Sequence, residues 1–259
     1  MKSLLVRLQN AITLWLVIFL RIDKSNLIPL SRLGTNYGGW FVPAKVLKGE
    51  LGKKFLISAG IGHDVSFDLE MQKCGFKVVA IDPLKDCCDY AQSQLISGDG
   101  LTVINAGLWK ESGSFQFFPP SVRNSNSWSI TNEHRSEENL GINFPTITLS
   151  EVLKKIRIDA DSYVILKVDI EGAERFIFED IVDNSSYLDF VCVELDFLQI
   201  LPFLSFNERR RRIKEARKLI LLLREKNFRL IHTEGFNFFW IKYNSHISEL
   251  QDGNWGEIK

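Results

Sequence analysis

The sequence predicts an α/β fold with a mostly parallel β-sheet, and three observations carry that prediction. From about residue 50 onward, short apolar runs alternate with amphipathic segments long enough for helices, a pattern typical of βαβ units. Several apolar runs end in an acid or a glycine, as strands do where they leave a sheet whose two faces are covered. The chain has 259 residues, 45% of them apolar, enough to bury a sizeable core.

The first part of this pattern contains two strand–helix pairs and a further strand. Gly75 is a stop signal at the end of the first predicted helix, and Pro83 suits the first position of the second. After the turn at Ser112 and Gly113, residues 114–118 are expected to form a small hairpin. The predicted strands are 54–58, 76–81 and 101–105, and the predicted helices run from about 64 to 73 and from 83 to about 96.

Residues 119–146 interrupt the pattern, because they are rich in Ser, Asn and Pro and show no period. A loop of this length inside a compact domain is usually functional or disordered. It is interpreted either as a lid over the site, holding Arg123, Trp128 and His134, or as a solvated excursion. Beyond it, helices are expected at 149–156 and 173–182, strands at 163–169 and 188–194, and a closing hairpin of 228–232 with 236–241.

The last predicted helix begins near Ser205, where Glu208 stands at the capping-box spacing. Apolar residues recur along it at helical spacing and are expected to face the sheet. Its first half is strongly basic, with Arg209–Arg212, Lys214, Arg217 and Lys218. The basic run is interpreted as a solvated face, with contact to an anionic membrane surface or a phosphate-bearing substrate as the alternative.

Charge and cysteine content narrow the range of partners. Basic and acidic residues number 32 each, so the net charge is zero and no global field indicates nucleic acid. The cysteines lack the paired spacing of metal ligands, and two adjacent cysteines make a poor structural disulfide. They are Cys74, Cys87, Cys88 and Cys192. Free thiols in a reducing, cytoplasmic location are therefore expected.

The N-terminal residues 1–33 are expected to form an apolar helix and a linker. The densest apolar stretch, Ala11–Leu20, is shorter than the about 20 residues that a bilayer-spanning helix needs. Arg21–Lys24 follows without a cleavage site for a signal peptide. Two interpretations stay open for residues 4–20: a helix packed on the protein or on a partner, and a helix in contact with a membrane surface.

A glycine turn and a strand-end acid indicate a nucleoside-type ligand. Gly60 and Gly62 follow the first strand and allow a sharp bend and a close ligand. Asp82 ends the next strand, where a carboxylate can accept hydrogen bonds from both hydroxyls of a ribose. Val65 stands where a nicotinamide fingerprint needs a third glycine, and Asp64 at the expected helix start would repel a pyrophosphate. These residues favour S-adenosylmethionine, which has no phosphate, over NAD or FAD.

The apolar run Tyr163–Leu166 continues into Lys167-Val-Asp-Ile-Glu-Gly-Ala-Glu174, which resembles the signature of the FkbM-type methyltransferases. The resemblance extends in order through the blocks Tyr37–Trp40, Ser58–Gly62, Ser66–Asp68, Ile81–Pro83, Thr146–Leu149 and Val193–Glu194. It implies a Rossmann-like class I methyltransferase, with a mostly parallel seven-stranded sheet and a terminal antiparallel hairpin. It also implies S-adenosylmethionine as cofactor and a methyltransferase domain over residues 34–245, followed by a tail at 246–259.

Two positions depart from the family pattern. Ser58 stands where many class I methyltransferases carry an acid, and Ser150 where family members often carry Asp. The first departure leaves the amino-acid end of the cofactor to backbone groups and to Asp64. The predicted cofactor-binding residues are Gly60, Gly62, Asp64, Asp82 and Gly107, the last just after the third strand.

The predicted reaction is methylation of a hydroxyl on a sugar, a glycan or another small metabolite. Methyl transfer to oxygen needs the acceptor aligned and its proton removed. Asp169 is the first candidate for this task, with Lys167 and Glu171 on the same side of the strand if its extension persists. Glu171 is alternatively a residue that caps the next helix or holds the turn, and Lys167 a structural partner of the acids. Glu194 ends the adjacent strand and is expected to line the same cleft.

No metal is predicted, because Asp169 and Glu171 lack an identifiable third ligand in the sequence. His134 is interpreted as a surface residue. Two other functions stay open: a nucleotide-dependent oxidoreductase, disfavoured by Val65 and Asp64, and a non-catalytic relative that binds S-adenosylmethionine or a glycan. The sequence gives no oligomeric state.

Overall fold

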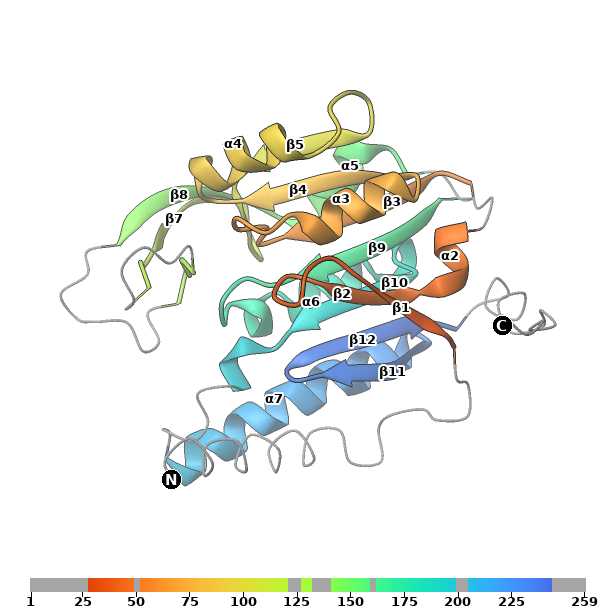
Figure 1. Ribbon diagram of the computed structural model, residues 1–259. Coiled ribbons are helices and arrows are strands. Elements are labelled where there is room, and N and C mark those ends of the chain that lie inside the picture. The colour runs from red at the N-terminus through yellow and green to blue at the C-terminus, as the bar shows by residue number, and fades with distance from the viewer. Residues whose placement is uncertain are drawn as a thin grey trace.

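A seven-stranded sheet forms the centre of the molecule (Figure 1). The computed structural model describes residues 28–48, 52–120, 127–131, 141–158, 162–198 and 205–243. Within these ranges the strand order is β11-β12-β10-β9-β3-β4-β5. The strands are β3 Lys54–Ala59, β4 Phe76–Asp82, β5 Leu101–Asn105, β9 Tyr163–Val168, β10 Phe190–Glu194, β11 Phe228–Glu234 and β12 Asn237–Lys242.

The sheet is mixed but mostly parallel. Neighbouring pairs among β5, β4, β3, β9 and β10 are parallel, whereas β12 runs antiparallel to both β10 and β11. The β11–β12 connection turns at Gly235, whose φ of 59° lies in the left-handed region that glycine adopts freely. The predicted α/β fold with a large, mostly parallel sheet is confirmed, and the predicted closing hairpin is the pair β11–β12.

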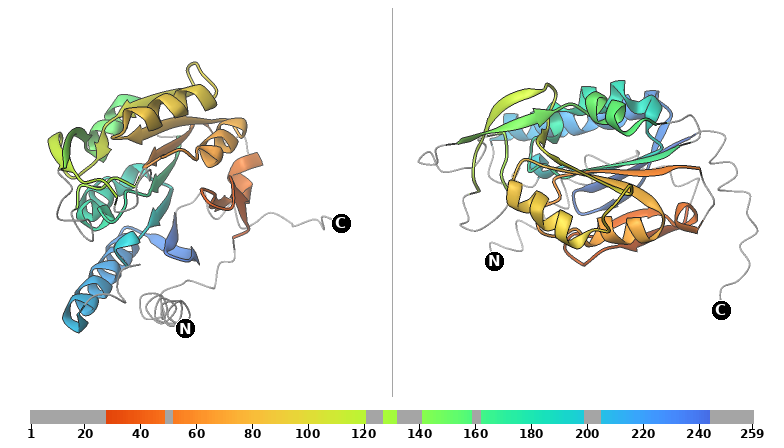
Figure 2. Two further views of the ribbon diagram at one scale, coloured as in Figure 1. Left: turned by 60° about the vertical axis from the view of Figure 1, so that its left-hand side comes forward. Right: turned by 90° about the horizontal axis from the view of Figure 1, so that it is seen from above.

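Helices cover both faces of the sheet, with α3 and α4 on one face and α5, α6 and α7 on the other (Figure 2). Because side chains alternate along a strand, Leu56 and Val78 belong to the core on the first face, and Ile57 and Val79 to the core on the second. The α-helices are α2 Ala44–Lys48, α3 Ser66–Lys73, α4 Lys85–Gln94, α5 Leu149–Ile156, α6 Phe178–Asp183 and α7 Phe206–Glu225.

Two smaller sheets flank the large one. In the first, β1 (Leu30–Leu33) pairs with β2 (Trp40–Pro43) in antiparallel fashion. The second has the order β6-β8-β7, with β6 at Gly107–Leu108, β7 at Gly113–Phe117 and β8 at Ile142–Ile147. In Figure 1 this second sheet extends beyond the ends of β4 and β5.

The strand β8 corrects two expectations. All of its residues but Ile147 were assigned to the loop 119–146, and residues 114–118 were expected to form a small local hairpin. Instead β7 pairs with β8, so that Phe117 lies opposite Ile142. Sequence reasoning missed β8 because Asn143 and Pro145 are poor strand formers, and Pro145 has no N–H to donate. Partners far along the chain supply the pairing that local preference does not.

The prediction of a single helix over 173–182 is also corrected. The chain forms the 3₁₀ helix η1 (Glu174–Phe176) and then α6, and two further 3₁₀ helices follow, η2 (Ser185–Tyr187) and η3 (Asp196–Leu198). The side chain of Glu174 accepts hydrogen bonds from the backbone N–H groups of Ile170 and Gly172, at 3.1 and 3.0 Å. These bonds form a tight turn before the first residues of the expected helix.

The helix α7 begins after Ser205, as predicted, and the Ser205 hydroxyl oxygen accepts the N–H of Glu208 at 3.3 Å. Its basic run is not wholly solvated, because Arg212 is only 2% exposed. The Arg212 guanidinium donates to the carbonyl of Phe197 at 3.0 Å and pairs with Glu208 at 3.2 Å. This arginine therefore fastens η3 to α7 and does not contribute to an open basic face.

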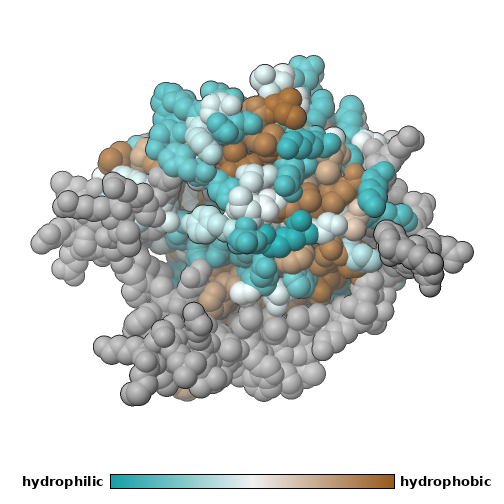
Figure 3. Space-filling view, viewed as in Figure 1, coloured by the Kyte–Doolittle hydropathy of each residue, from teal (hydrophilic) through white to brown (hydrophobic). Residues whose placement is uncertain are grey.

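Several expectations fall on parts of the chain outside the described ranges: the helix at 4–20, the tail at 246–259, and the side chains of Arg123 and His134. Among the helices that are described, none combines the length and the apolar character that a bilayer crossing requires. Figure 3 shows hydrophilic and hydrophobic residues interspersed over the face that α3 and α4 cover.

Candidate active site

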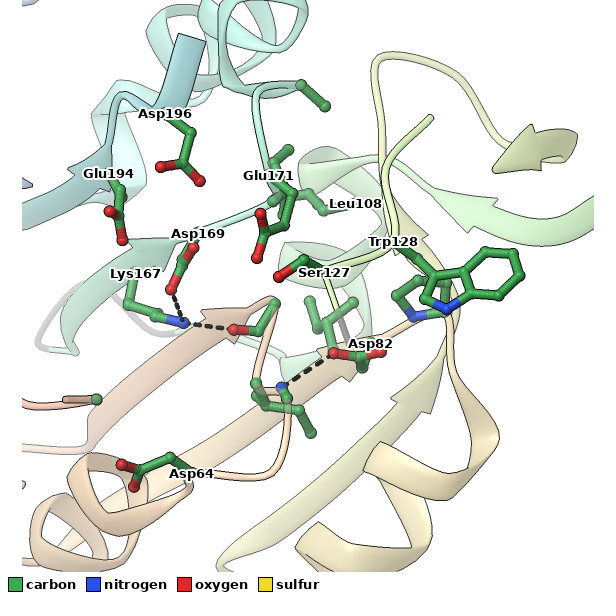
Figure 4. Close-up of a pocket in the computed structure, with 18 of the residues that line it drawn as sticks. Asp64, Asp82, Leu108, Ser127, Trp128, Lys167, Asp169, Glu171, Glu194 and Asp196 are labelled. Atoms are coloured by element: carbon green, nitrogen blue, oxygen red, sulfur yellow. Dashed lines mark hydrogen bonds and ion pairs between the residues drawn. The ribbon is translucent and has the colours of Figure 1, made fainter. Parts of the chain in front are cut away.

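A cavity of about 640 Å³ opens at the carboxyl ends of β3, β4, β9 and β10. Every residue that the sequence predicts for catalysis or cofactor binding lines it. They are Gly60, Gly62, Asp64, Asp82, Gly107, Lys167, Asp169 and Glu171. Figure 4 shows the labelled acids Asp169, Glu171, Glu194 and Asp196 on one side of Lys167, with Asp82 and Asp64 on the other. The cavity therefore has two chemically different sides.

The glycine turn after β3 packs closely against the end of β9. Gly60 has a φ of 74°, and a Cβ at this position would overlap the backbone carbonyl of Asp169. The carbonyl of Gly60 accepts a hydrogen bond from Lys167 Nζ at 2.5 Å. Gly62, with a φ of 53°, has open space where its Cβ would stand. Glycine is thus required at the first position for packing, while the second faces the space that a ligand could fill.

Asp82 is the last residue of β4 and ties this strand to the glycine turn. Its Oδ2 accepts the N–H of Gly62 at 3.2 Å, and its Oδ1 accepts the N–H of Leu84 at 2.9 Å. Burial raises the pKa of Asp82, whereas these two backbone donors lower it. Each carboxylate oxygen has a further lone pair, so the side chain can still accept bonds from a ligand in the cavity.

Asp64 lies just before α3 and holds a neighbouring loop. Its Oδ1 accepts the N–H of Ser66 at 3.1 Å, and its Oδ2 accepts the hydroxyl of Thr35. Burial would raise the pKa of Asp64, but the bonds from Ser66 and Thr35 lower it, and the net shift is downward. The expectation that Asp64 opens the helix is corrected, because α3 begins at Ser66.

Gly107 comes from β6 and reaches the cavity from the smaller sheet. A Cβ at this position would overlap the ring of Phe117. The absence of a side chain therefore lets Phe117 pack beside the cavity, which it also lines.

Lys167 is a charged residue within the otherwise apolar strand β9, and it is only 5% exposed. Its Nζ lies 3.5 Å from Asp169 Oδ2 and 5.4 Å from the ring centre of Trp40. The expected extension does not persist beyond Asp169, because β9 ends at Val168 and Glu171 adopts a φ of 59°. All three side chains nevertheless line the cavity, since the turn brings Glu171 back over the end of the strand.

Glu174 holds this turn. The sequence offered that role to Glu171, but the backbone N–H groups of Ile170 and Gly172 bind Oε1 of Glu174. Glu174 is fully buried, and burial raises its pKa from 4.5 to about 8. The turn that positions Glu171 therefore rests on a carboxyl group that favours its neutral form at neutral pH.

Glu194 and Asp196 complete the acidic side. Glu194 ends β10 and Asp196 begins η3. Burial, reinforced by the charge of Asp169, raises the pKa of Glu194 to about 7, and burial followed by the charge of Glu194 raises the pKa of Asp196 well above its usual range. Carboxylates this close to one another cannot all ionise at ordinary cost.

Asp196 also brings a third carboxylate oxygen close to those of Asp169 and Glu171, which the sequence did not reveal. One carboxylate oxygen each from Asp169, Glu171 and Asp196 lies within 4.8 Å of the others. Hard divalent cations such as Mg²⁺ and Ca²⁺ take oxygen ligands of this kind. These residues are where such an ion could be held.

Sequence reasoning did not single out several residues that line the cavity: Tyr37, Trp40, Asp68, Asp196 and Asn237. Tyr37, Trp40 and Asp68 lie in blocks that carry the family resemblance, which was the available signal. Trp128 comes from the expected loop and packs edge-on against Phe144, with ring centres 5.6 Å apart. This part of the loop therefore forms one wall of the cavity.

A glycine turn, a strand-end acid and an acid-lined cavity lie together at the carboxyl ends of parallel strands, the place where open α/β sheets bind nucleoside-type ligands. The family model of the methyltransferase FkbM domain matches residues 52–230, more than half of the chain. The chain belongs to the FkbM methyltransferase family, whose members generally use S-adenosylmethionine. Among curated proteins, no match to the chain was found.

Proposed function

We propose that this protein is an S-adenosylmethionine-dependent O-methyltransferase that acts on a sugar, a glycan or another small hydroxylated metabolite. The observation that carries the proposal is the placement of Gly62 and Asp82 in one cavity with the acids after β9 and β10. The sheet, with its reversed strand β12, supports the class I methyltransferase arrangement that the resemblance implies.

The cavity suits this cofactor better than a dinucleotide. Its volume of about 640 Å³ lies within the range of about 300–1,000 Å³ typical of small-molecule sites. Asp82 would accept the ribose hydroxyls, and the open space at Gly62 would receive the nucleoside. Val65 replaces a third glycine, and the carboxylate of Asp64 stands in front of α3, where a pyrophosphate would need positive potential. When bound, S-adenosylmethionine supplies a methyl carbon already activated by its sulfonium.

The acidic side would align the acceptor and remove its proton. Lys167 holds Asp169 at the edge of the cavity through their 3.5 Å ion pair, so Asp169 is placed to orient the acceptor hydroxyl. Glu194, with a pKa of about 7, is matched to proton transfer near neutral pH. In this scheme the acceptor oxygen would take the methyl group as the carbon–sulfur bond breaks and leaves S-adenosylhomocysteine, and a Glu194 carboxylate oxygen would accept the hydroxyl proton.

Calorimetry with S-adenosylhomocysteine and with NAD tests the cofactor. The wild-type protein should bind the former and not the latter. Asp82→Ala should weaken S-adenosylhomocysteine binding at least about tenfold, because a bond to a charged group contributes about 1.5–3 kcal/mol. Asp89→Ala, which removes an exposed acid of α4 outside the cavity, should bind like the wild type. Binding of NAD would favour the oxidoreductase instead.

The acceptor is sought by mass spectrometry of glycans and metabolites incubated with the protein and S-adenosylmethionine. A gain of one methyl group that requires both components identifies it. Cofactor binding without any methylated product would favour a non-catalytic relative.

Contact of residues 4–20 with a membrane surface remains a separate proposal. It rests on the apolar stretch Ala11–Leu20 and its basic flanks. Sedimentation of the full chain with anionic vesicles, compared with a chain lacking residues 1–27, would test it. Equal sedimentation of the two chains would contradict it.

A further inference from the structure

Asp68 is a buried acid in the wall of the cavity, and it has no role in the reaction proposed above. It lies in the first turn of α3, is only 3% exposed, and lines the cavity. Its Oδ1 makes no hydrogen bond to any part of the chain that the structure describes. A buried carboxylate oxygen without a donor is costly, so its place in the wall of a cavity indicates a donor on the ligand.

The surroundings of Asp68 supply polarity but no direct partner for Oδ1. Ser58, on β3, is fully buried and lies beside Lys167 of β9 in the sheet register. Burial raises the pKa of Asp68, while the charge of Lys167 and the hydroxyl of Ser58 oppose that rise. The Nζ of Lys167 itself bonds to the Gly60 carbonyl at 2.5 Å and faces Asp169 at 3.5 Å.

Asp64, the acid first expected to bind the amino-acid end of the cofactor, has a donor at each oxygen, whereas Oδ1 of Asp68 has none among the described residues. The two oxygens of Asp64 accept the N–H of Ser66 and the hydroxyl of Thr35. Ser58, at the end of β3, has no charge to offer. Ser58 stands on β3 where many class I methyltransferases carry an acid. Asp68, whose Oδ1 lacks a donor, stands on α3, which covers this strand. The two residues are therefore neighbours.

We infer that Asp68 binds the α-ammonium group of the amino-acid end of S-adenosylmethionine, taking the place of the acid that Ser58 replaces on β3. An ammonium group offers three N–H donors and a full positive charge, which satisfies the orphaned Oδ1 and the buried charge together. This inference rests on the proposed function, because it assumes that S-adenosylmethionine occupies the cavity.

The test compares two ligands that share the adenosine part. S-adenosylhomocysteine has the α-amino and α-carboxylate groups, and 5′-methylthioadenosine lacks both. In calorimetry, Asp68→Asn should weaken binding of S-adenosylhomocysteine by about tenfold or more, the effect of one charge-assisted hydrogen bond. Binding of 5′-methylthioadenosine should stay within about twofold of the wild type.

A matched control removes a different partly buried acid. Asp180 of α6 accepts the N–H of Leu149 at 2.9 Å and lies outside the cavity, so Asp180→Asn should leave both affinities unchanged. A second measurement needs no variant at all. The wild-type protein should bind the analogue of S-adenosylhomocysteine that lacks only the amino group about tenfold or more weakly than the parent ligand.

The outcomes separate the inference from the proposed function. If the wild type binds none of these ligands, the proposed function fails. If it binds S-adenosylhomocysteine and its deaminated analogue equally well, or if Asp68→Asn leaves the S-adenosylhomocysteine affinity intact, the inference fails while the proposed function stands. An equal loss of both adenosine ligands in Asp68→Asn would assign Asp68 to support of the glycine turn and would also overturn the inference.

Discussion

The carboxylates on the two sides of the cavity have different surroundings. On the glycine-turn side, Asp82 and Asp64 each accept backbone N–H groups, from Gly62 and Leu84 and from Ser66 respectively. On the acidic side, Asp169, Glu171, Glu194 and Asp196 lie close together, and burial and mutual repulsion raise the pKa of Glu194 and Asp196. On the glycine-turn side, backbone donors therefore hold the carboxylates, and on the acidic side repulsion between neighbouring acids shifts their pKa values.

This difference indicates different tasks. Fixed backbone donors hold Asp82 in one orientation, which is what a binding site requires for a cofactor of constant shape. Glu194, with a pKa of about 7, exchanges protons readily near neutral pH, which suits removal of a hydroxyl proton. Lys167 joins the two sides, because its Nζ contacts both the Gly60 carbonyl and Asp169.

The largest expected effect comes from Asp169→Asn on the acidic side. The variant should bind S-adenosylhomocysteine like the wild type but transfer methyl groups about 10²-fold more slowly, because a misplaced acceptor can cost a factor of that size. Single-turnover kinetics on the acceptor measures it. The control is Glu179→Gln, which changes an exposed acid of α6. Wild-type turnover in Asp169→Asn would show that Asp169 has only a structural role.

The glycine pair offers a second, backbone-level test. Gly60→Ala should lower the free energy of unfolding by about 3 kcal/mol or more, because its Cβ would overlap the Asp169 carbonyl at a left-handed φ. Gly62→Ala meets open space, so it should cost only the about 1–2 kcal/mol of the left-handed conformation. Urea denaturation of the two variants measures the difference. Equal losses would show that the packing between the glycine turn and the end of β9 is not as close as described.

A third prediction concerns pH and Glu194. Its pKa of about 7 means that the base form disappears below neutrality, so methyl transfer should be about tenfold slower at pH 6 than at its plateau. In Glu194→Gln the plateau should drop and the rise through pH 7 should vanish. Rates measured from pH 5.5 to 9 test both. If the rise persists in the variant, Asp196 takes over as the titrating group.

The smallest effect is expected from Glu174→Gln, which tests stability. Because burial raises the pKa of Glu174 from 4.5 to about 8, the folded state keeps a proton that the unfolded state releases above 4.5. Stability from this group is therefore full below pH 4.5 and is lost as the pH rises through 8. Glutamine preserves the acceptor for Ile170 and Gly172 without the charge. At pH 8.5 the variant should melt about 2–4 °C higher than the wild type, and at pH 5 equally.

Melting curves of Glu174→Gln at both pH values decide between two accounts. A constant offset from the wild type would mean that the turn depends on the carboxylate geometry and not on its proton. Asp180→Asn at the same pH values controls for removal of a partly buried acid elsewhere.

Local sequence rules predicted much of the fold and part of the candidate site. Both faces of the strands Lys54–Ala59 and Tyr163–Val168 are covered, so their sequences are almost continuous apolar runs. The cavity lies at the carboxyl ends of these strands. The same rules missed β8, whose pairing with β7 compensates for Pro145, and the burial of Arg212, since a run of arginines normally indicates a solvated face.

The sequence by itself determined the glycine turn, the strand-end acid Asp82 and the acids after β9, because each depends on residues next to one another in the chain. Only the tertiary structure decided which acids meet. The sequence already placed Glu194 beside the cleft, but Asp68 from α3 and Asp196 from η3 reach the same cavity only through strand order and helix packing. Burial and neighbouring charge set the pKa values of Glu194 and Asp196, and both effects arise only when distant segments pack together. The same packing buries Oδ1 of Asp68 without a donor.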